Sequence, residues 1–197
     1  MTMPLTVDIR YLHQLAWQPA QFAHPLWLAA AGVRAENYGY GRSQVVDSVL
    51  NRALNRLRNF PPHSLPAVLS PHQQCQIVGP ERLAARCLAL GLVYLQCDDY
   101  LRLRGYRQAL SSWLSEADIQ QLMGMGYRGQ RPVRLSPEQL PAVALQLGHS
   151  LAQQVRHHCL VWRAISISLP PQPRALFLSS VLAIAVDSWL TRLERLL

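Results

Sequence analysis

The chain has 197 residues, half of them hydrophobic, which predicts one globular domain over 1–197 and excludes an intrinsically disordered protein. Its 19 basic residues, all of them Arg, outnumber 11 acidic residues, and the net charge of +8 favours acidic partners. The N-terminus lacks the pattern of a secretory signal, and no apolar run reaches the roughly 20 residues of a membrane span. We therefore expect a cytoplasmic protein without membrane insertion.

The N-terminal part, residues 1–42, is irregular, and two aromatic-rich pieces within it, 11–17 and 22–32, predict short helices. A second irregular stretch, 60–80, contains five prolines and predicts a surface loop that crosses the domain. The sequence contains no internal repeat of fixed period.

Between these stretches, Ser43 is placed to cap a helix that runs to about Asn59. Its predicted apolar stripe has residues at helical spacing, namely Val46, Leu50, Ala53 and Leu57. Arg52 and Arg56 lie one turn apart, and we expect them on the opposite, solvent-exposed face.

The clearest helix begins at Pro80 and Glu81, because Pro is tolerated in the first turn and an acid there favours the helix dipole. Apolar residues recur on two of its faces, which is typical of a central helix packed between neighbours. The acidic pair Asp98 and Asp99 marks the point where this helix leaves the core.

Two short helices are predicted over 106–114 and 115–123, and Ser115 with Asp118 forms an acidic variant of the capping box for the second. The segment 124–134 is a basic, Gly-rich loop. The apolar pattern after this loop predicts a long helix.

Near the C-terminus, Ile165, Ile167 and Leu169 alternate with serines, which predicts a short extended segment at 164–169. A last helix is predicted over 174–196. The fold class that follows is a mostly α, single globular irregular helical domain.

Seven histidines and four cysteines raise the question of a metal site. His157 and His158 precede a cysteine, but neighbouring residues of a helix point about 100° apart, so both cannot easily face one ion. Neither CxxC nor HxxxH spacing occurs. We predict no metal site, and we expect the two histidines to act as cationic residues at a helix end.

Catalytic motifs are also absent from the sequence, which has no GxSxG, GxxxxGK[ST] or GxGxxG segment. We therefore predict no cofactor and no enzymatic activity. Asp187, inside the apolar C-terminal helix, is expected to form an ion pair or hydrogen bond with an Arg, with a catalytic role as the alternative.

The remaining hypothesis for the function is that the chain binds another macromolecule. The arginines are spread over many segments, so a basic helical nucleic-acid-binding regulator is the alternative rather than the first hypothesis. The predicted protein-binding residues are arginines in three clusters: Arg52, Arg56, Arg102, Arg104, Arg107, Arg128 and Arg131. Candidate aromatic anchors are Trp17, Trp27 and Trp113, with a core position as the alternative for each.

Four segments carry a resemblance to a known family. They are YLHQLAWQ with HPLWLAA near the N-terminus, RLAARCLALGLVYLQCDDYLR, ALSSWLSEADIQQLMGMG, and VWRAISISLP from Val161 to Pro170. Together they resemble the YscK/PscK/MxiK/OrgA-type (SctK) accessory proteins of bacterial type III secretion systems, and the resemblance spans most of the chain.

The resemblance implies a non-enzymatic helical adaptor of the cytoplasmic sorting platform, at the cytoplasmic face of the bacterial inner membrane. Such an adaptor links the cytoplasmic, forkhead-associated-like domain of the inner-membrane ring protein to the pod protein, and indirectly to the stator and the ATPase. The resemblance implies no cofactor, and we expect no nucleic-acid partner.

Overall fold

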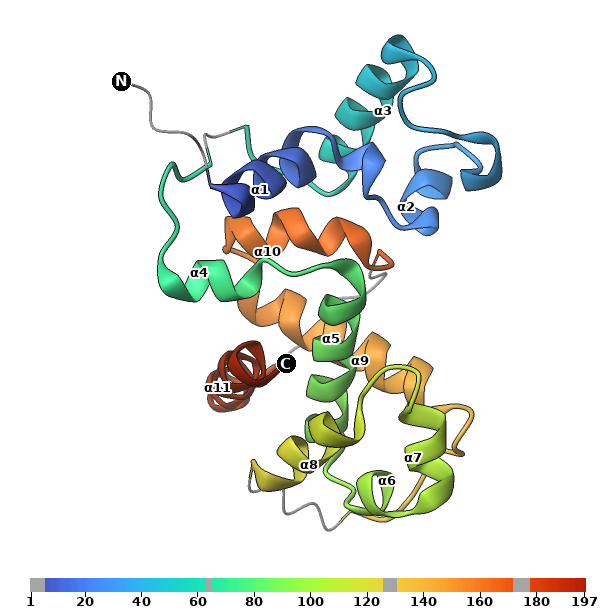
Figure 1. Cartoon of the computed structure of the whole chain (residues 1–197), viewed down its shortest axis with the longest axis vertical. Coiled ribbons are helices and arrows are strands. Elements are labelled where there is room, and N and C mark those ends of the chain that lie inside the picture. Colours follow the sequence, from blue (N-terminus) through green and yellow to red (C-terminus); the bar gives the residue numbers. More distant parts are fainter. Residues whose placement is uncertain (1–5, 63–64, 126–130, 172–177) are drawn as a thin grey trace. The chain divides into compact units, whose positions relative to one another are not determined.

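The computed structural model describes residues 6–62, 65–125, 131–171 and 178–197. These residues form eleven α-helices and three short 3-10 helices, and no strand occurs among them (Figure 1). The prediction of a mostly α fold is confirmed.

Contacts within the chain group the residues into two compact units. Unit 1 comprises Met1–Val78 with His157–Pro171, and unit 2 comprises Gly79–Arg156 with Gln172–Leu197. Each unit therefore combines segments from distant parts of the chain. The prediction of one domain over 1–197 stays a prediction.

Unit 1 contains eight short elements. They are α1 (Val7–Trp17), η1 (Pro19–Gln21), α2 (Pro25–Ala30), η2 (Ala35–Asn37), α3 (Gln44–Leu57), α4 (Pro71–Gln76), α10 (Leu160–Ile165) and η3 (Ser166–Ser168). The two short helices predicted within 1–42 are confirmed as α1 and α2. The predicted loop at 60–80 is interrupted by α4, which Ser70 and Gln73 begin with a reciprocal capping box.

The extended segment predicted at 164–169 is wrong, because these residues end helix α10 and form the turn η3. The hydroxyl groups of Ser166 and Ser168 donate to the carbonyls of Arg163 and Ile165, at 3.4 and 2.8 Å. The serines thus donate to carbonyls at a helix end, whereas the alternating pattern had predicted an extended segment.

Helix α3 begins where predicted, since the Ser43 hydroxyl accepts a hydrogen bond from the backbone N–H of Val46. The predicted apolar stripe is wrong in part: the buried residues are Asp47, Leu50 and Leu54, whereas Val46 and Leu57 are 47% and 49% exposed. The helix is thus rotated about its axis relative to the predicted orientation. Apolar spacing alone could not reveal this rotation, because polar contacts on the buried side of the helix help to set it.

Arg58, which follows α3 directly, forms several long-range hydrogen bonds within unit 1. Its guanidinium donates to the carbonyls of Leu15 and Ala16 at 3.0 and 2.8 Å, and to that of Arg163 at 3.2 Å. These carbonyls lie near the C-terminal ends of α1 and α10, where a cation is favourable. Burial, and then the nearby Arg163, lower the pKa of Arg58 to about 9.

Unit 2 contains the longest helices. These longest helices are α5 (Pro80–Leu95), α9 (Leu140–Arg156) and α11 (Ser180–Leu196), and the unit also contains the shorter helices α6 (Asp99–Arg102), α7 (Arg104–Leu110) and α8 (Glu116–Gly124). The capping box of Ser115 with Asp118 is confirmed at the start of α8. The predicted last helix is α11, and positions 174–177 of that prediction lie outside the described residues.

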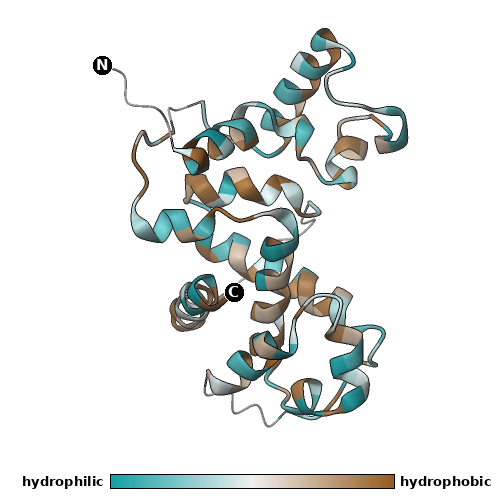
Figure 2. Cartoon of the chain, viewed as in Figure 1, coloured by the Kyte–Doolittle hydropathy of each residue, from teal (hydrophilic) through white to brown (hydrophobic). Residues whose placement is uncertain are grey.

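Helix α5 begins at Pro80, as predicted, and its central position is also confirmed. Every residue from Arg86 to Val93 is buried, so the helix is covered on all sides over two turns. Apolar colours dominate this middle part of α5 (Figure 2).

Helices α5 and α9 cross at close range, and two glycines make this possible. A Cβ atom on Gly91 of α5 would collide with the backbone carbonyl of Ala144, and one on Gly148 of α9 would collide with that of Cys87. The two backbones are therefore nearly in contact, which only residues without a side chain allow.

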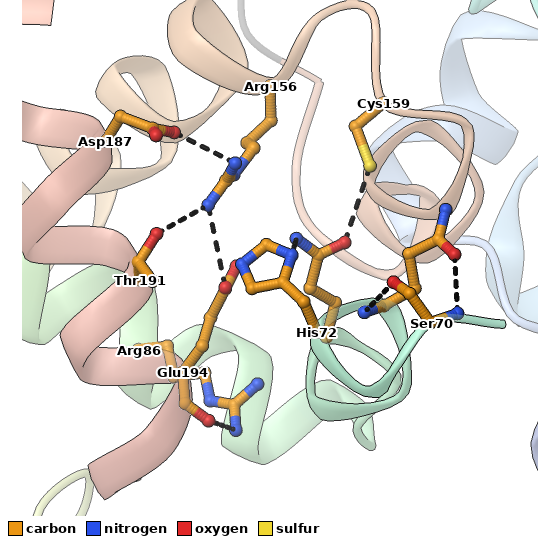
Figure 3. Close-up of polar contacts among 10 residues, drawn as sticks. Ser70, His72, Arg86, Arg156, Cys159, Asp187, Thr191 and Glu194 are labelled. Atoms are coloured by element: carbon orange, nitrogen blue, oxygen red, sulfur yellow. Dashed lines mark hydrogen bonds and ion pairs between the residues drawn. The ribbon is translucent and has the colours of Figure 1, made fainter. Parts of the chain in front are cut away.

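A charged cluster ties α11 to the end of α9 in unit 2. Figure 3 shows Arg156 reaching toward α11, where it pairs with Asp187 at 2.9 Å and with Glu194 at 3.6 Å and donates to the Thr191 hydroxyl. Arg86 of α5 donates to the backbone carbonyl of Glu194 at 2.9 Å. The predicted pairing of Asp187 with an arginine is confirmed.

Unit 2 is expected to lose stability in mild acid because of His149, a buried residue of α9. Burial lowers its pKa from 6.5 to about 4, so between these values the unfolded chain binds a proton that the folded chain does not. The free energy of unfolding should therefore fall as the pH falls through this window, by about 2 kcal/mol near pH 5.

Urea unfolding of the wild-type protein and of His149→Gln, at neutral pH and in mild acid, measures this effect. The substitution should remove most of the difference between the two pH values, whatever it does to stability at neutral pH. An equal loss in both proteins would contradict the assignment to His149.

Candidate protein-binding surfaces

The predicted protein-binding arginines fall into both units. Arg52 and Arg56 lie on α3 of unit 1, and both are exposed. The cluster of Arg102, Arg104 and Arg107 lies on α6 and α7 of unit 2. Arg131 is exposed in unit 2, and Arg128 lies outside the described residues.

Three of these arginines converge on one open pocket of unit 2. The pocket has a volume of about 430 Å³ and is lined by Arg102, Arg104, Arg107, Gln108 and Glu116. Arg102 pairs with Asp98 at 3.2 Å, and Arg107 pairs with Glu116. Arg104 is exposed and forms no ion pair within the described part of the chain. The pocket can therefore accept a carboxylate, with Arg104 as the available cation.

The described part of the predicted basic loop is fixed to unit 2 by two tyrosines. The Tyr100 hydroxyl accepts from the backbone N–H groups of Arg134 and Leu135, both at 3.1 Å, and the Tyr106 hydroxyl donates to the Leu135 carbonyl at 2.7 Å. The backbone N–H of Arg131 also donates to the carbonyl of Gln96 at 3.0 Å. This anchoring presents the Arg131 side chain from a defined backbone position.

A second open groove of unit 2, of about 590 Å³, contains Trp113. Its lining combines charged and apolar residues: Glu81, Arg82, Ala85, Ser112, Trp113, Asp118, Leu196 and Leu197. Trp113 is 39% exposed, which leaves part of the indole ring available to a partner.

The other two candidate anchors lie in unit 1. Trp27 is half-buried and its indole N–H donates to the carbonyl of Leu169 at 2.9 Å, so it holds the fold together. Trp17 is 41% exposed and packs edge-to-face on Phe60, with ring centroids 6.0 Å apart. Sequence reasoning could not separate these environments.

The outer face of α3 carries exposed apolar residues that the sequence prediction had left out. Val45 and Val49 are 74% and 54% exposed, and they share this surface with Arg52 and Arg56. Three valines among the first six residues of α3 were the available signal, because one helix face cannot bury all of them.

Polar contacts on the inner side of α3 explain which residues of the helix face solvent. The Asp47 carboxylate accepts from the Tyr38 hydroxyl at 2.7 Å and from the backbone N–H of Gly41 at 2.9 Å. Asn51 accepts from the backbone N–H of Ala20, at 2.9 Å. Burial, and then the bond to Asp47, raise the pKa of Tyr38.

Metal ligands do not gather within the described residues, where no three His, Cys, Asp or Glu side chains form a group that could hold an ion. His157 and His158 lie just beyond the end of α9, and their rings are 3.7 Å apart, so the expected divergence of 100° is wrong. A turn rather than a helix holds them, and successive residues of a turn can place their side chains together.

Part of the positive charge is used inside the fold. Arg58 bonds to helix-end carbonyls in unit 1, whereas Arg86 and Arg156 are largely enclosed in unit 2. The net charge of +8 therefore overstates the charge that a partner can reach.

Comparisons with known proteins give one match. A family model described as a type III secretion system subunit matches residues 10–171, which is most of the chain. No curated protein and no solved structure matches the chain. Within the described residues, no helix is both long and apolar enough to cross a membrane.

Proposed function

The chain belongs to a family of type III secretion system subunits, and on this premise we propose that it is a non-enzymatic adaptor of the cytoplasmic sorting platform. It links the cytoplasmic, forkhead-associated-like domain of the inner-membrane ring protein to the pod protein, and through the pod to the stator and the ATPase. It works at the cytoplasmic face of the bacterial inner membrane.

The observation that carries the proposal is the open pocket of Arg102, Arg104 and Arg107. Two of these arginines already pair with carboxylates of unit 2. Exposed ion pairs contribute little stability, so these arginines can give up their own carboxylates and pair with carboxylates of a partner. An adaptor needs surfaces of this kind, which recognise acidic protein segments. The resemblance to the YscK/PscK/MxiK/OrgA-type proteins supplies the identity of the partners.

Reversal of the charge at Arg104 is expected to weaken binding to one of the two partners by about tenfold. Arg104→Glu removes the available cation and repels a partner carboxylate, without breaking an ion pair of unit 2. Titration of the purified ring-protein domain and of the purified pod protein, each against the full chain, measures the effect.

Arg10→Glu is the matched control, because Arg10 is an exposed arginine of α1 in unit 1. It should bind both partners as the wild type does. Equal affinities for the wild type and Arg104→Glu would show that the pocket is not a binding surface.

The net charge of +8 keeps nucleic acid as the second candidate. A nucleic-acid-binding regulator would bind duplex DNA with an affinity that falls steeply with salt, with a logarithmic slope of several units. We expect no such binding at physiological salt, and its observation would favour the regulator.

A further inference from the structure

We propose that the outer face of α3 docks one amphipathic helix of a protein partner, whose apolar stripe continues into a cluster of carboxylates. This inference rests on the proposed adaptor function and adds to it the surface of unit 1 and the chemistry of what binds there.

The apolar and cationic residues of α3 are arranged in sequence along one face. Val45, Val49, Arg52 and Arg56 follow each other at spacings of four, three and four residues, which places them in one row along the helix. The N-terminal half of this row is apolar and exposed, whereas the C-terminal half is cationic and exposed. Figure 2 shows both apolar and polar colours on α3.

The charge of this face points to an acidic partner. Asp47, the acid of α3, is buried and bonded to Tyr38 and Gly41, so it cannot neutralise the arginines from the outer face. Arg56 forms no ion pair among the residues that the structure describes, and Arg52 bonds to the Ser48 carbonyl of its own helix. Carboxylates of a partner would complement both guanidinium groups.

The dimensions of α3 suit a helix as the occupant. Its 14 residues extend over about 21 Å, or nearly four turns, which matches the contact length of one amphipathic helix. Valine side chains form a low ridge, and the larger side chains of a second helix can pack into the grooves beside it.

A bilayer fits this face less well than a protein. Arg52 and Arg56 share the row of Val45 and Val49, so insertion of the valines would carry the guanidinium groups toward the acyl region. The exposed apolar residues of this row, Val45 and Val49, are also valines rather than the Trp, Phe and Leu typical of membrane-surface helices.

A second copy of the chain also fits poorly. A two-fold symmetric pair would bring the same surface from both copies together. Each arginine would then face valines or arginines of the other α3 and would find no carboxylate there.

Site-specific cross-linking in the native bacterium tests the proposal. A photoreactive amino acid replaces Val49 in the full chain, or Val68 as the control, an exposed valine of unit 1 outside α3. The expected product at position 49 joins the chain to a helical, acidic segment of the ring protein or the pod protein. A product with lipid, with a second copy, or with no excess over position 68 would overturn the proposal.

A pair of substitutions gives an independent readout. Val49→Asp and Arg56→Glu should each reduce recovery of the same one partner by about tenfold, while the other partner is retained. Val68→Asp and Arg10→Glu are the controls, and circular dichroism verifies that all four variants fold. Unchanged recovery with both α3 variants overturns the docking surface alone, whereas failure of the wild type to recover either partner overturns the adaptor function.

Discussion

Gly91→Ala and Gly148→Ala should each prevent α5 and α9 from packing as they do in the wild type. The added methyl group meets backbone atoms of the other helix, Ala144 in one case and Cys87 in the other, and backbone cannot move aside as a flexible side chain can. Because overpacking of a rigid core costs roughly 1 to 3 kcal/mol in ordinary cases, we expect a loss of more than about 3 kcal/mol here.

Urea unfolding followed by circular dichroism measures the loss, and hydrogen exchange of the α5 and α9 amides locates it in unit 2. Gly124→Ala is the matched control, because Gly124 ends α8 and its added methyl group meets open space. If Gly91→Ala were as stable as Gly124→Ala, the close crossing of the two helices would be refuted.

Arg58→Met should destabilise unit 1 by about 3 kcal/mol or more, since it removes a half-buried cation together with several hydrogen bonds. The methionine keeps much of the apolar stem but removes one donor from each of the carbonyls of Leu15, Ala16 and Arg163. It also removes the contact of the guanidinium with the Phe60 ring, at 4.3 Å from the ring centroid.

The matched control for Arg58→Met is Arg10→Met, at an exposed position of the same unit. Its free energy of unfolding should stay within about 0.5 kcal/mol of the wild type. Equal unfolding curves for the two variants would mean that Arg58 does not hold the ends of α1 and α10.

Local sequence signals predicted several elements correctly. Ser43 and Ser115 begin helices because a side-chain oxygen can accept a backbone N–H of the first turn, and this contact needs no knowledge of the rest of the fold. The two apolar faces of α5 likewise predicted its central position, since a helix with two such faces must be covered on both.

Long-range contacts explain what the sequence could not predict. The rotation of α3 depends on Asp47 and Asn51 bonding to backbone groups of other segments, and apolar spacing carries no trace of those bonds. The importance of Arg58 depends on Leu15 and Arg163, which are distant in the sequence. An arginine after a helix is otherwise an ordinary surface residue.

The candidate surfaces likewise include one feature that the sequence predicted and one that it did not. The closeness of Arg102, Arg104 and Arg107 in the sequence predicted one cluster, and the pocket that all three line is known only from the structure. The exposed valines of α3 were not predicted, because the side of α3 that faces solvent is decided by its buried polar contacts.

Affinity purification of the tagged full chain from its native bacterium tests the adaptor function most directly. Mass spectrometry of the recovered proteins should identify both the inner-membrane ring protein and the pod protein of the type III secretion system, in amounts well above those from an untagged strain. Recovery of neither protein, or of DNA in their place, would contradict the account.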